Sequence, residues 1–536
     1  MKVKLMGAAR TVTGSCYIVE AADRRFAIDC GMHQGNAEIE KRNWDVDIYD
    51  PRAIEFILMT HAHMDHSGLL PRLVQKGFRG KVYMTPPTRD LLRIMLLDSA
   101  HIQEMEAQWR SRKHRRRGAE DITPLYTQKD AQAAFPLFST VTYGEAFSPA
   151  PGITATFRDA GHILGAAMAE LTVAENGTQS RVVFSGDIGR PAQLLIRNPS
   201  VIDTADFLFM ESTYGNRDHR DETDSLNELA EAIAWSYGRG EKVIIPAFAV
   251  GRTQEMIYSL HLLAKEGRLP ADMPVFVDSP LAIQATEIFR KSREYMDAET
   301  KALLANGEDP LKLPQLRFTP STQESMEING LRGPAVVISA SGMANAGRIK
   351  HHLRHNLWRG GASVVFVGFQ AQGTTGRKIV DGAEKVRIFN EDIAVRAKIF
   401  TINGFSAHAG QGQLIEWLGH FKTREEMRLF LIHGEYNAQQ ALAGLIRDRF
   451  GIEAAIPDYL EEVTLAPGRE LARVAYPEKA APKVDWEFLI ADMETRLARL
   501  RERRGAMEGK VWMEQTELRD RLLEINRNLA GIISEI

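Results

Sequence analysis

Six consecutive residues, His61-Ala62-His63-Met64-Asp65-His66, contain three imidazoles and one carboxylate and follow the apolar run 54–60. Because strand side chains alternate between two faces, His61 and His63 are expected to bind one metal ion together. Asp65 and His66 come a turn later and are expected to reach a second ion. Histidine and carboxylate ligands without a nearby thiolate indicate a catalytic zinc-type site. A solvated polar turn is the weaker alternative, because histidines are rarely so dense at a strand end.

Two ions need more ligands than this segment offers, and later strand ends supply candidates. His162 follows a strand-like segment and lies between glycines in the run 159–165. Asp187 has the same setting in the run 184–189, and its carboxylate could bridge two cations. Asp29 ends another strand and could orient a ligand histidine through a hydrogen bond. Each residue alone fits a core histidine or a turn aspartate equally well, but their shared setting favours a two-metal site.

The elements that must position these residues are short β-runs in the first 205 residues. Strands are expected at 2–6, 15–20, 25–29, 54–60, 81–85, 153–159, 167–173 and 181–185. Helical segments interrupt them, notably 88–116. This pattern favours sheets packed face to face and covered by helices.

From about 206 to 395 the pattern changes to longer strand and helix alternation. Strands are expected at 242–246, 275–277, 335–339 and 364–367, with helices from Thr253, from Ala282 and over 348–356. Such alternation predicts a parallel, doubly wound sheet. Strand-like segments at 399–402 and 428–433 then return, each followed by a histidine-bearing loop, so the second domain is predicted to be inserted into the first. Residues 483–536 show helical spacing and either pack on their own domain or form a dimer contact.

Composition restricts the class of protein. The 536 residues are 44% hydrophobic and 26% charged, which is ordinary for a globular protein. Only Cys16 and Cys30 occur, which excludes a disulfide scaffold and fits a reducing compartment. The sequence shows no signal peptide and no membrane span, so a soluble cytoplasmic protein is expected. Because the net charge is only −3, a polyanion must meet a local basic surface. The run 110–117, with six cations, is one candidate, and a solvated helix end is its alternative.

The metal-ligand pattern resembles the successive motifs of the metallo-β-lactamase superfamily. Three further runs, Glu211-Ser212-Thr213-Tyr214-Gly215, Gly404-Phe405-Ser406-Ala407-His408 and Leu431-Ile432-His433-Gly434-Glu435, resemble motifs of its β-CASP ribonucleases. Bacterial and archaeal homologues of the cleavage and polyadenylation specificity factor endonuclease are the nearest match. The resemblance implies an α/β fold, a metallo-β-lactamase αββα sandwich with an inserted β-CASP domain and a C-terminal helical extension. The predicted parts are 1–205 and 396–482 for the sandwich, 206–395 for the β-CASP domain and 483–536 for the tail.

The resemblance also implies a ligand for each position of a two-zinc centre. The first Zn²⁺ would be held by His61, His63 and His162. The second would be held by Asp65, His66 and His433. Asp187 would bridge the two ions, which leaves one position for a bridging water or hydroxide. A histidine at 433 favours RNA, because DNA-processing members of the group usually carry an apolar residue there.

Two such cations can activate a shared water and clamp a phosphodiester, so hydrolysis of RNA is the predicted reaction. The leaving alkoxide needs a proton, and His408 is the candidate general acid, with Glu211 holding its other ring nitrogen. The predicted catalytic set is therefore Asp29, Asp65, Glu211 and His408. A structural histidine after a strand is the alternative for His408.

Substrate contacts are expected mainly from the inserted domain. Gly-rich turns between strand and helix could offer backbone N–H groups to phosphate, although any doubly wound sheet needs such turns for packing. The predicted contacts are Ser341, Gly342, Arg348, His352, Arg377 and Ser406. Relatives commonly have two glycines where this chain has Asn345 and Ala346.

Two other functions compete with RNA hydrolysis. Hydrolysis of a thioester, lactam or other small ester uses the same metal chemistry but needs neither an inserted domain nor His408. A non-catalytic RNA-processing subunit is the other alternative, and the complete set of ligand types argues against it. The sequence leaves endonucleolytic and exonucleolytic action open, and it makes a homodimer plausible.

Overall fold

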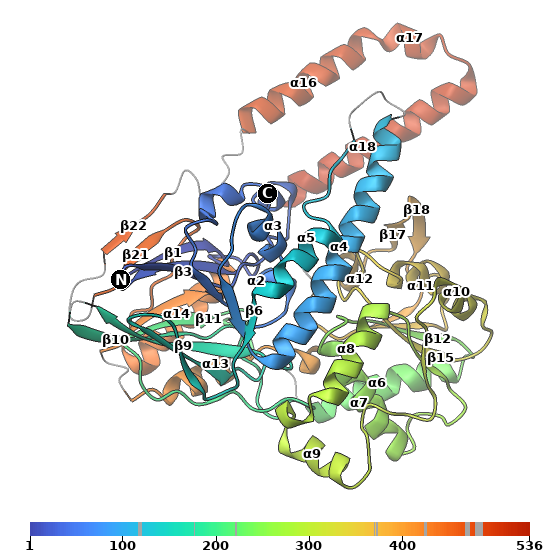
Figure 1. Cartoon of the computed structure of the whole chain (residues 1–536). Coiled ribbons are helices and arrows are strands. Elements are labelled where there is room, and N and C mark those ends of the chain that lie inside the picture. The colour runs from blue at the N-terminus through green and yellow to red at the C-terminus, as the bar shows by residue number, and fades with distance from the viewer. Residues whose placement is uncertain are drawn as a thin grey trace. The chain divides into compact units, whose positions relative to one another are not determined.

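The computed structural model describes residues 1–536 except 116–120, 176, 220–221, 369, 371–372, 423–425, 467–471, 477–485 and 536. The chain divides into two compact units, Met1–Ala480 and Ala481–Ile536. Figure 1 shows the elements along the chain.

Two sheets form a sandwich in the first unit. The first sheet has the order β22 (Ala472–Val474), β21 (Glu462–Thr464), β1 (Lys2–Gly7), β2 (Cys16–Ala21), β3 (Arg24–Ile28), β4 (Phe56–Leu58), β5 (Lys81–Met84) and β6 (Phe138–Thr140). The second has the order β20 (Arg428–Ile432), β11 (Phe207–Glu211), β10 (Thr178–Phe184), β9 (Ala167–Glu175), β8 (Ile153–Asp159) and β7 (Ala146–Ala150).

Alternating side chains of both sheets bury a common core. Tyr17 of β2 stacks on Phe184 of β10 with ring centroids 5.7 Å apart. Phe209 extends the row, with its ring centroid 4.6 Å from that of Phe184, and Phe430 follows with its centroid 4.5 Å from that of Phe209. All four rings are buried, and each contributes about 1.5–3 kcal/mol by burial. This aromatic row holds the two sheets face to face.

Helices cover the outer faces of the sandwich. They are α1 (Ala37–Lys41), α2 (Met64–Ser67), α3 (Leu70–Gln75), α4 (Pro86–Arg115), α5 (Gln128–Ala134), α13 (Gln411–Gly419) and α14 (Tyr436–Phe450), with 3₁₀ turns at Val46–Tyr49, Phe135–Leu137 and Asn403–Phe405. Leu73 of α3 and Leu92 and Leu96 of α4 are fully buried in the main core. The αββα sandwich predicted from the sequence is thereby confirmed.

A third sheet has six strands, all paired in parallel. Its order is β14 (Leu316–Phe318), β13 (Val275–Val277), β15 (Ala335–Ser339), β12 (Lys242–Pro246), β16 (Ser363–Phe366) and β19 (Lys398–Thr401). Its helices are α6 (Glu222–Tyr237), α7 (Arg252–Lys265), α8 (Pro280–Lys291), α9 (Ala298–Ala305), α10 (Thr322–Gly330), α11 (Ile349–Asn356) and α12 (Thr375–Val380), with a 3₁₀ turn at Arg293–Tyr295 and a hairpin of β17 (Lys385–Ile388) and β18 (Glu391–Ala394). The central strands are buried throughout, as strands covered by helices on both faces must be.

Strand pairing crosses both predicted borders of the insertion. Strand β11, which the sequence interpretation assigned to the inserted domain, pairs with β10 and β20 of the sandwich. Strand β19, assigned to the returning sandwich, pairs with β16 of the third sheet. The division into functional domains itself stays a prediction.

The second unit consists of α16 (Trp486–Glu502), α17 (Arg504–Glu508) and α18 (Trp512–Glu535), which confirms the helical extension. Apolar side chains of α16 such as Phe488 and Leu497 are at least half exposed. A role in dimerisation stays a prediction. Among the described residues, no helix is long and apolar enough to cross a membrane.

Candidate metal centre

The histidine-rich segment begins just after β4 and continues into α2. His61 and His63 lie on the connection, and His63 directly precedes the first residue of α2. Asp65 and His66 lie on the single helical turn of α2, where the sequence alone suggested only a tight turn. The helical turn directs these two side chains to a different point from the two preceding histidines.

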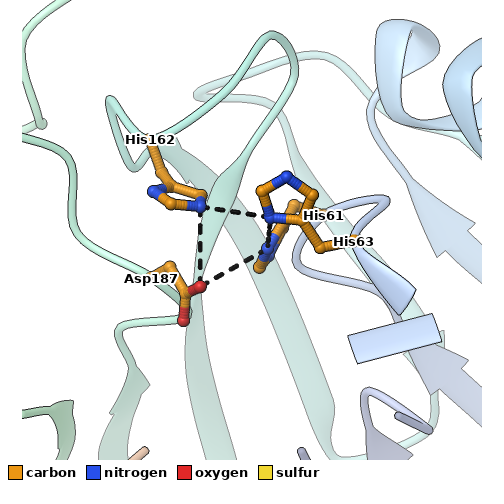
Figure 2. A group of neighbouring side chains, drawn as sticks. All are labelled: His61, His63, His162 and Asp187. Atoms are coloured by element: carbon orange, nitrogen blue, oxygen red, sulfur yellow. Dashed lines mark hydrogen bonds and ion pairs between the residues drawn. The ribbon is translucent and has the colours of Figure 1, made fainter. Parts of the chain in front are cut away.

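Three histidines and one carboxylate converge at a first point (Figure 2). His63 Nδ1 lies 3.1 Å from His61 Nε2 and 3.2 Å from His162 Nε2. Asp187 Oδ2 lies 3.5 Å from His61 Nε2 and 3.6 Å from His162 Nε2. The four side chains come from the loops after β4, β8 and β10, that is, from strand ends of both sheets.

These separations fit a four-coordinate ion. Ligands about 2.0–2.1 Å from a tetrahedral ion lie roughly 3.3 Å from one another. The four contacts, from 3.1 to 3.6 Å, bracket that value. Imidazole nitrogens facing one another at this distance bring lone pairs together, and a cation between them removes that repulsion.

A second group lies next to the first and contains Asp65, His66 and His433. His66 Nε2 lies 3.1 Å from His433 Nε2, and Asp65 Oδ2 lies 3.6 Å from His433 Nε2. Asp187 Oδ1 lies 3.2 Å from His66 Nε2. One oxygen of Asp187 therefore faces each group, which is the geometry a bridging carboxylate needs.

Hydrogen bonds select the tautomer of three of these histidines. His66 Nδ1 donates to Asp29 Oδ2 at 2.8 Å, the contact proposed for Asp29 from the sequence. The Thr60 hydroxyl donates to the same carboxylate, so it accepts from His61 Nδ1 at 3.1 Å. In each case the proton lies on Nδ1, and the Nε2 lone pair faces the centre.

The third histidine is oriented in the same way. Thr213 Oγ1 lies 3.1 Å from His433 Nδ1 and donates to the His433 carbonyl at 3.2 Å. It therefore accepts the Nδ1 proton, and the His433 Nε2 lone pair also faces the centre. Thr60 and Thr213 were not singled out from the sequence. Their positions in the sequence could have identified them, since Thr60 directly precedes His61 and Thr213 lies inside the motif that begins at Glu211.

The protonation of the cluster suits cation binding. Burial lowers the pKa of His63 to about 4, so its ring is neutral near pH 7. Burial would raise the pKa of Asp65, but a hydrogen bond with His433 and the charges of His66, His433 and His63 together outweigh burial and lower the pKa to about 2. For His66 the charges of Asp187 and Asp29 outweigh burial and raise the pKa. Before a cation binds, His66 therefore carries a second proton on Nε2; a cation displaces this proton and leaves the Nδ1 proton on its hydrogen bond to Asp29.

His408 lies beside this cluster. Its Nδ1 is 3.2 Å from Glu211 Oε1 and 3.9 Å from Asp187 Oδ2. Burial would lower its pKa, but the charges of Glu211 and Asp187 raise it to about 9. The buried Glu211 carboxylate is itself fixed by the Ile188 N–H at 2.6 Å. His408 is thus a cationic imidazole with one nitrogen occupied by Glu211 and a side chain 21% exposed.

The loop that carries His408 is held by residues that sequence reasoning missed. The Arg190 guanidinium donates to the Ser406 carbonyl at 2.9 Å and to Glu255 of α7 at 2.6 Å. His219 Nε2 donates to the His408 carbonyl at 2.9 Å. Only the fold shows these contacts, because the three residues belong to no motif recognised in the sequence. They connect the loop to both the sandwich and the inserted sheet.

Two of the predicted substrate contacts, His352 and Arg348, bind a buried carboxylate. His352 is fully buried, and its Nε2 donates to Asp278 at 2.6 Å. The prediction that it binds RNA is wrong, because RNA has no access to its ring. The Arg348 guanidinium donates to Asp278 and to the carbonyls of Thr319 and Pro320, at 2.7 to 2.9 Å. Burial would raise the pKa of Asp278, but its hydrogen bonds, chiefly with His352, lower it to about 2.

The other predicted substrate contacts lie in varied settings. Arg377 is paired with Asp381, one helical turn along, at 2.8 Å. Ser406 is buried, whereas Ser341 is only partly buried and its hydroxyl contacts the Ala346 carbonyl at 3.3 Å. Gly342 lies against the ring of Phe248. Within the basic run, Arg110 and Arg112 are exposed, and residues 113–117 lie outside the part whose side chains are described.

Gly189 shows how closely the backbone around the cluster is packed. A Cβ there would lie 1.6 Å from the Gly161 carbonyl oxygen, so Gly189→Ala has to displace the backbone next to His162. We expect a loss of about 1–3 kcal/mol of unfolding free energy or more. Gly444→Ala is the matched control, because that position in α14 has open space and alanine favours a helix by about 0.5–1 kcal/mol. Urea unfolding measures both, and a neutral Gly189→Ala would contradict the packing described.

Family models match three parts of the chain. The metallo-beta-lactamase superfamily domain matches residues 18–187, and the Beta-Casp domain matches 253–379. The Zn-dependent metallo-hydrolase RNA specificity domain matches 392–457, a range that contains His408 and His433.

Curated relatives extend the same similarity over most of the chain. Ribonuclease TTHA0252 of Thermus thermophilus is 35% identical over 463 residues, which is 86% of this chain and 100% of that protein. Transcription termination factor FttA of Methanocaldococcus jannaschii is 30% identical, covering 86% of this chain and 71% of that protein. FttA of Methanothermobacter thermautotrophicus is 32% identical, covering 87% and 72%. With the sandwich, the insertion and both histidine groups in place, this chain belongs to the β-CASP family of the metallo-β-lactamase superfamily.

Proposed function

We propose that this chain is a ribonuclease that uses two metal ions, most simply two Zn²⁺, to hydrolyse phosphodiester bonds of RNA. The Asp187 carboxylate carries the proposal, because each of its oxygens faces a different histidine group. The first ion would be held by His61, His63, His162 and Asp187. The second would be held by Asp65, His66, His433 and the other oxygen of Asp187. The donors are nitrogen and carboxylate oxygen, which suit zinc.

When bound, a pair of metal ions would supply a water of lowered pKa as nucleophile and would neutralise charge on the phosphoryl oxygens. The residues of the chain provide the rest. Attack of water on phosphorus breaks the bond to the leaving ribose oxygen, which needs a proton. His408 would donate that proton from Nε2, because its Nδ1 is already bound to Glu211.

RNA is the substrate class that the comparisons favour. One relative is named a ribonuclease, and the region around His408 and His433 matches a domain described as conferring RNA specificity. Hydrolysis of a thioester or another small ester would not need the His408 and Glu211 pair as a proton donor. A non-catalytic role is disfavoured by the full set of convergent ligand atoms. A homodimer and an unpaired stretch of RNA in the site are further parts of this proposal.

The decisive test is incubation of the metal-loaded protein with RNA labelled at its 5′ or 3′ end, followed by sizing of the products over time. Substrates with a 5′-monophosphate and a 5′-triphosphate distinguish entry from an end from internal cleavage. We expect metal-dependent cleavage that chelation stops and added Zn²⁺ restores. Hydrolysis of a thioester in place of RNA, or no reaction with fully loaded protein, would overturn the proposal.

A further inference from the structure

The two central strands of the inserted sheet, β12 and β15, are neighbours whose following connections leave in opposite directions. The chain passes from β12 to β13 on one side, and from β15 to β16 on the other. In open parallel sheets, ligands bind beyond the carboxyl ends of the strands at such a switch point. The loop after β12 carries Phe248, and the loop after β15 carries Gly342.

Phe248 is exposed where the residues around it are buried. Its exposed fraction is 44%, whereas Ala247, Ala249 and Val250 are exposed by 1%, 7% and 3%. The inner part of its ring packs on Gly342, where an added Cβ would lie only 3.1 Å from ring carbon Cδ2. A side chain at 342 would push the ring away, so the glycine provides a flat support beneath an exposed aromatic ring.

This support is fixed in place. Arg348, at the end of the loop that begins after β15, donates to the buried carboxylate of Asp278, and Ser339 Oγ donates to the Asp278 carbonyl. Gln370 Nε2 donates to the Gly342 carbonyl at 3.1 Å. A ring on a rigid support loses little entropy when a flat ligand covers it.

The loop carrying Phe248 also adjoins the metal centre. Gly251 lies against Ile163, the residue after His162, with an ideal Cβ 3.0 Å from its Cγ2. The helix that follows carries Glu255, which binds the Arg190 side chain that holds the His408 loop. The same short segment therefore lies against the residue that follows His162 and presents an aromatic ring.

We propose that Phe248 is a stacking platform for one unpaired base of the RNA, close to the cleaved phosphate. This inference rests on the proposed ribonuclease function and names the part of the substrate that the inserted domain recognises. A nucleobase fits the observations because every base has a flat face, and stacking on aromatic rings is how proteins hold single strands without reading sequence. Double-stranded RNA does not fit, because its bases already stack on one another.

The experiment measures single-turnover cleavage of a single-stranded RNA by wild-type protein, Phe248→Ala and Phe248→Trp. We expect Phe248→Ala to raise the RNA concentration for half-saturation by about 5- to 150-fold, the range that loss of one base stack gives. Phe248→Trp should restore most of the affinity. Trp358→Ala is the control. Trp358 is similarly exposed, but it precedes β16 and so lies at the amino ends of the parallel strands, opposite to Phe248.

A second arm replaces one base at a time with an abasic site. At one position relative to the cut, the wild type should lose as much affinity as Phe248→Ala does with intact RNA, and Phe248→Ala should lose nothing further. An unchanged Phe248→Ala, or an equal loss at every abasic position, would overturn the stacking proposal while leaving the nuclease intact. Failure of the wild type to cleave any RNA would instead overturn the proposed function.

Discussion

Asp187→Ala is expected to abolish RNA cleavage, with a fall of more than roughly 10³-fold in the single-turnover rate. The physical reason is that this one carboxylate faces both histidine groups, so its removal weakens both ions together. Water that is not bound to a metal has a far higher pKa than metal-bound water and is a poor nucleophile at neutral pH. His61→Ala should have a similar effect through the first group. Metal content by mass spectrometry and the cleavage rate are the two measurements.

The control for this prediction is Asp448→Ala, which removes a largely exposed carboxylate of α14. Its rate and stability should stay close to those of the wild type, since exposed substitutions usually change stability by less than about 0.5 kcal/mol. Circular dichroism should show that Asp187→Ala keeps its fold. Normal turnover by folded Asp187→Ala would remove the two-metal assignment.

His408→Ala is expected to slow cleavage by roughly 10²-fold or more while both ions stay bound, which is the scale of losing a general acid. The ring nitrogen near Asp187 is already engaged by Glu211, so His408 is not counted among the metal ligands. A substrate whose leaving oxygen is replaced by sulfur needs no proton donor. His408→Ala should therefore cleave this substrate almost as fast as the wild type does.

His420→Ala serves as the comparison, since His420 is an exposed histidine at the end of α13. It should match the wild type on both substrates. If His408→Ala were equally slow with the sulfur-substituted RNA, proton donation would not be its role. Loss of metal from His408→Ala would point instead to a ligand.

The first half of the site could be predicted from the sequence because its residues are close together in the chain. His61 to His66 follow one strand, and their spacing alone indicated two ions. His433 could be added only through resemblance, because it lies far along the chain from the rest of the site. It is, for example, 220 residues from Thr213, whose hydroxyl it contacts. Strand pairing explains the contact, since Glu211 and Ile432 are partners in the parallel pair of β11 and β20. Spacing along the sequence holds no information on such a pairing.

Other differences between prediction and structure also arise from contacts between residues that are far apart in the sequence. His352 lies in a helix near two Gly-rich turns, and nothing in its sequence neighbours showed that Asp278, 74 residues earlier, would bury it. The sequence also did not show which sheet β11 and β19 would join, because both are short apolar strands of the kind that both sheets use. Which sheet such a strand joins depends on partners far along the chain.

The pairing of β11 with β20 also means that the two histidine groups are completed at different times during synthesis. His61, His63, His162 and Asp187 have all been made when residue 187 leaves the ribosome, but His433 follows about 250 residues later. At about 5–20 residues per second this interval is roughly 10–50 s. Closing the chain across the insertion then costs about 5 kcal/mol of loop entropy, which only the completed inserted sheet and the β11–β20 pairing can offset. The four residues of the first group are thus all present in a nascent chain that still lacks His433 of the second group.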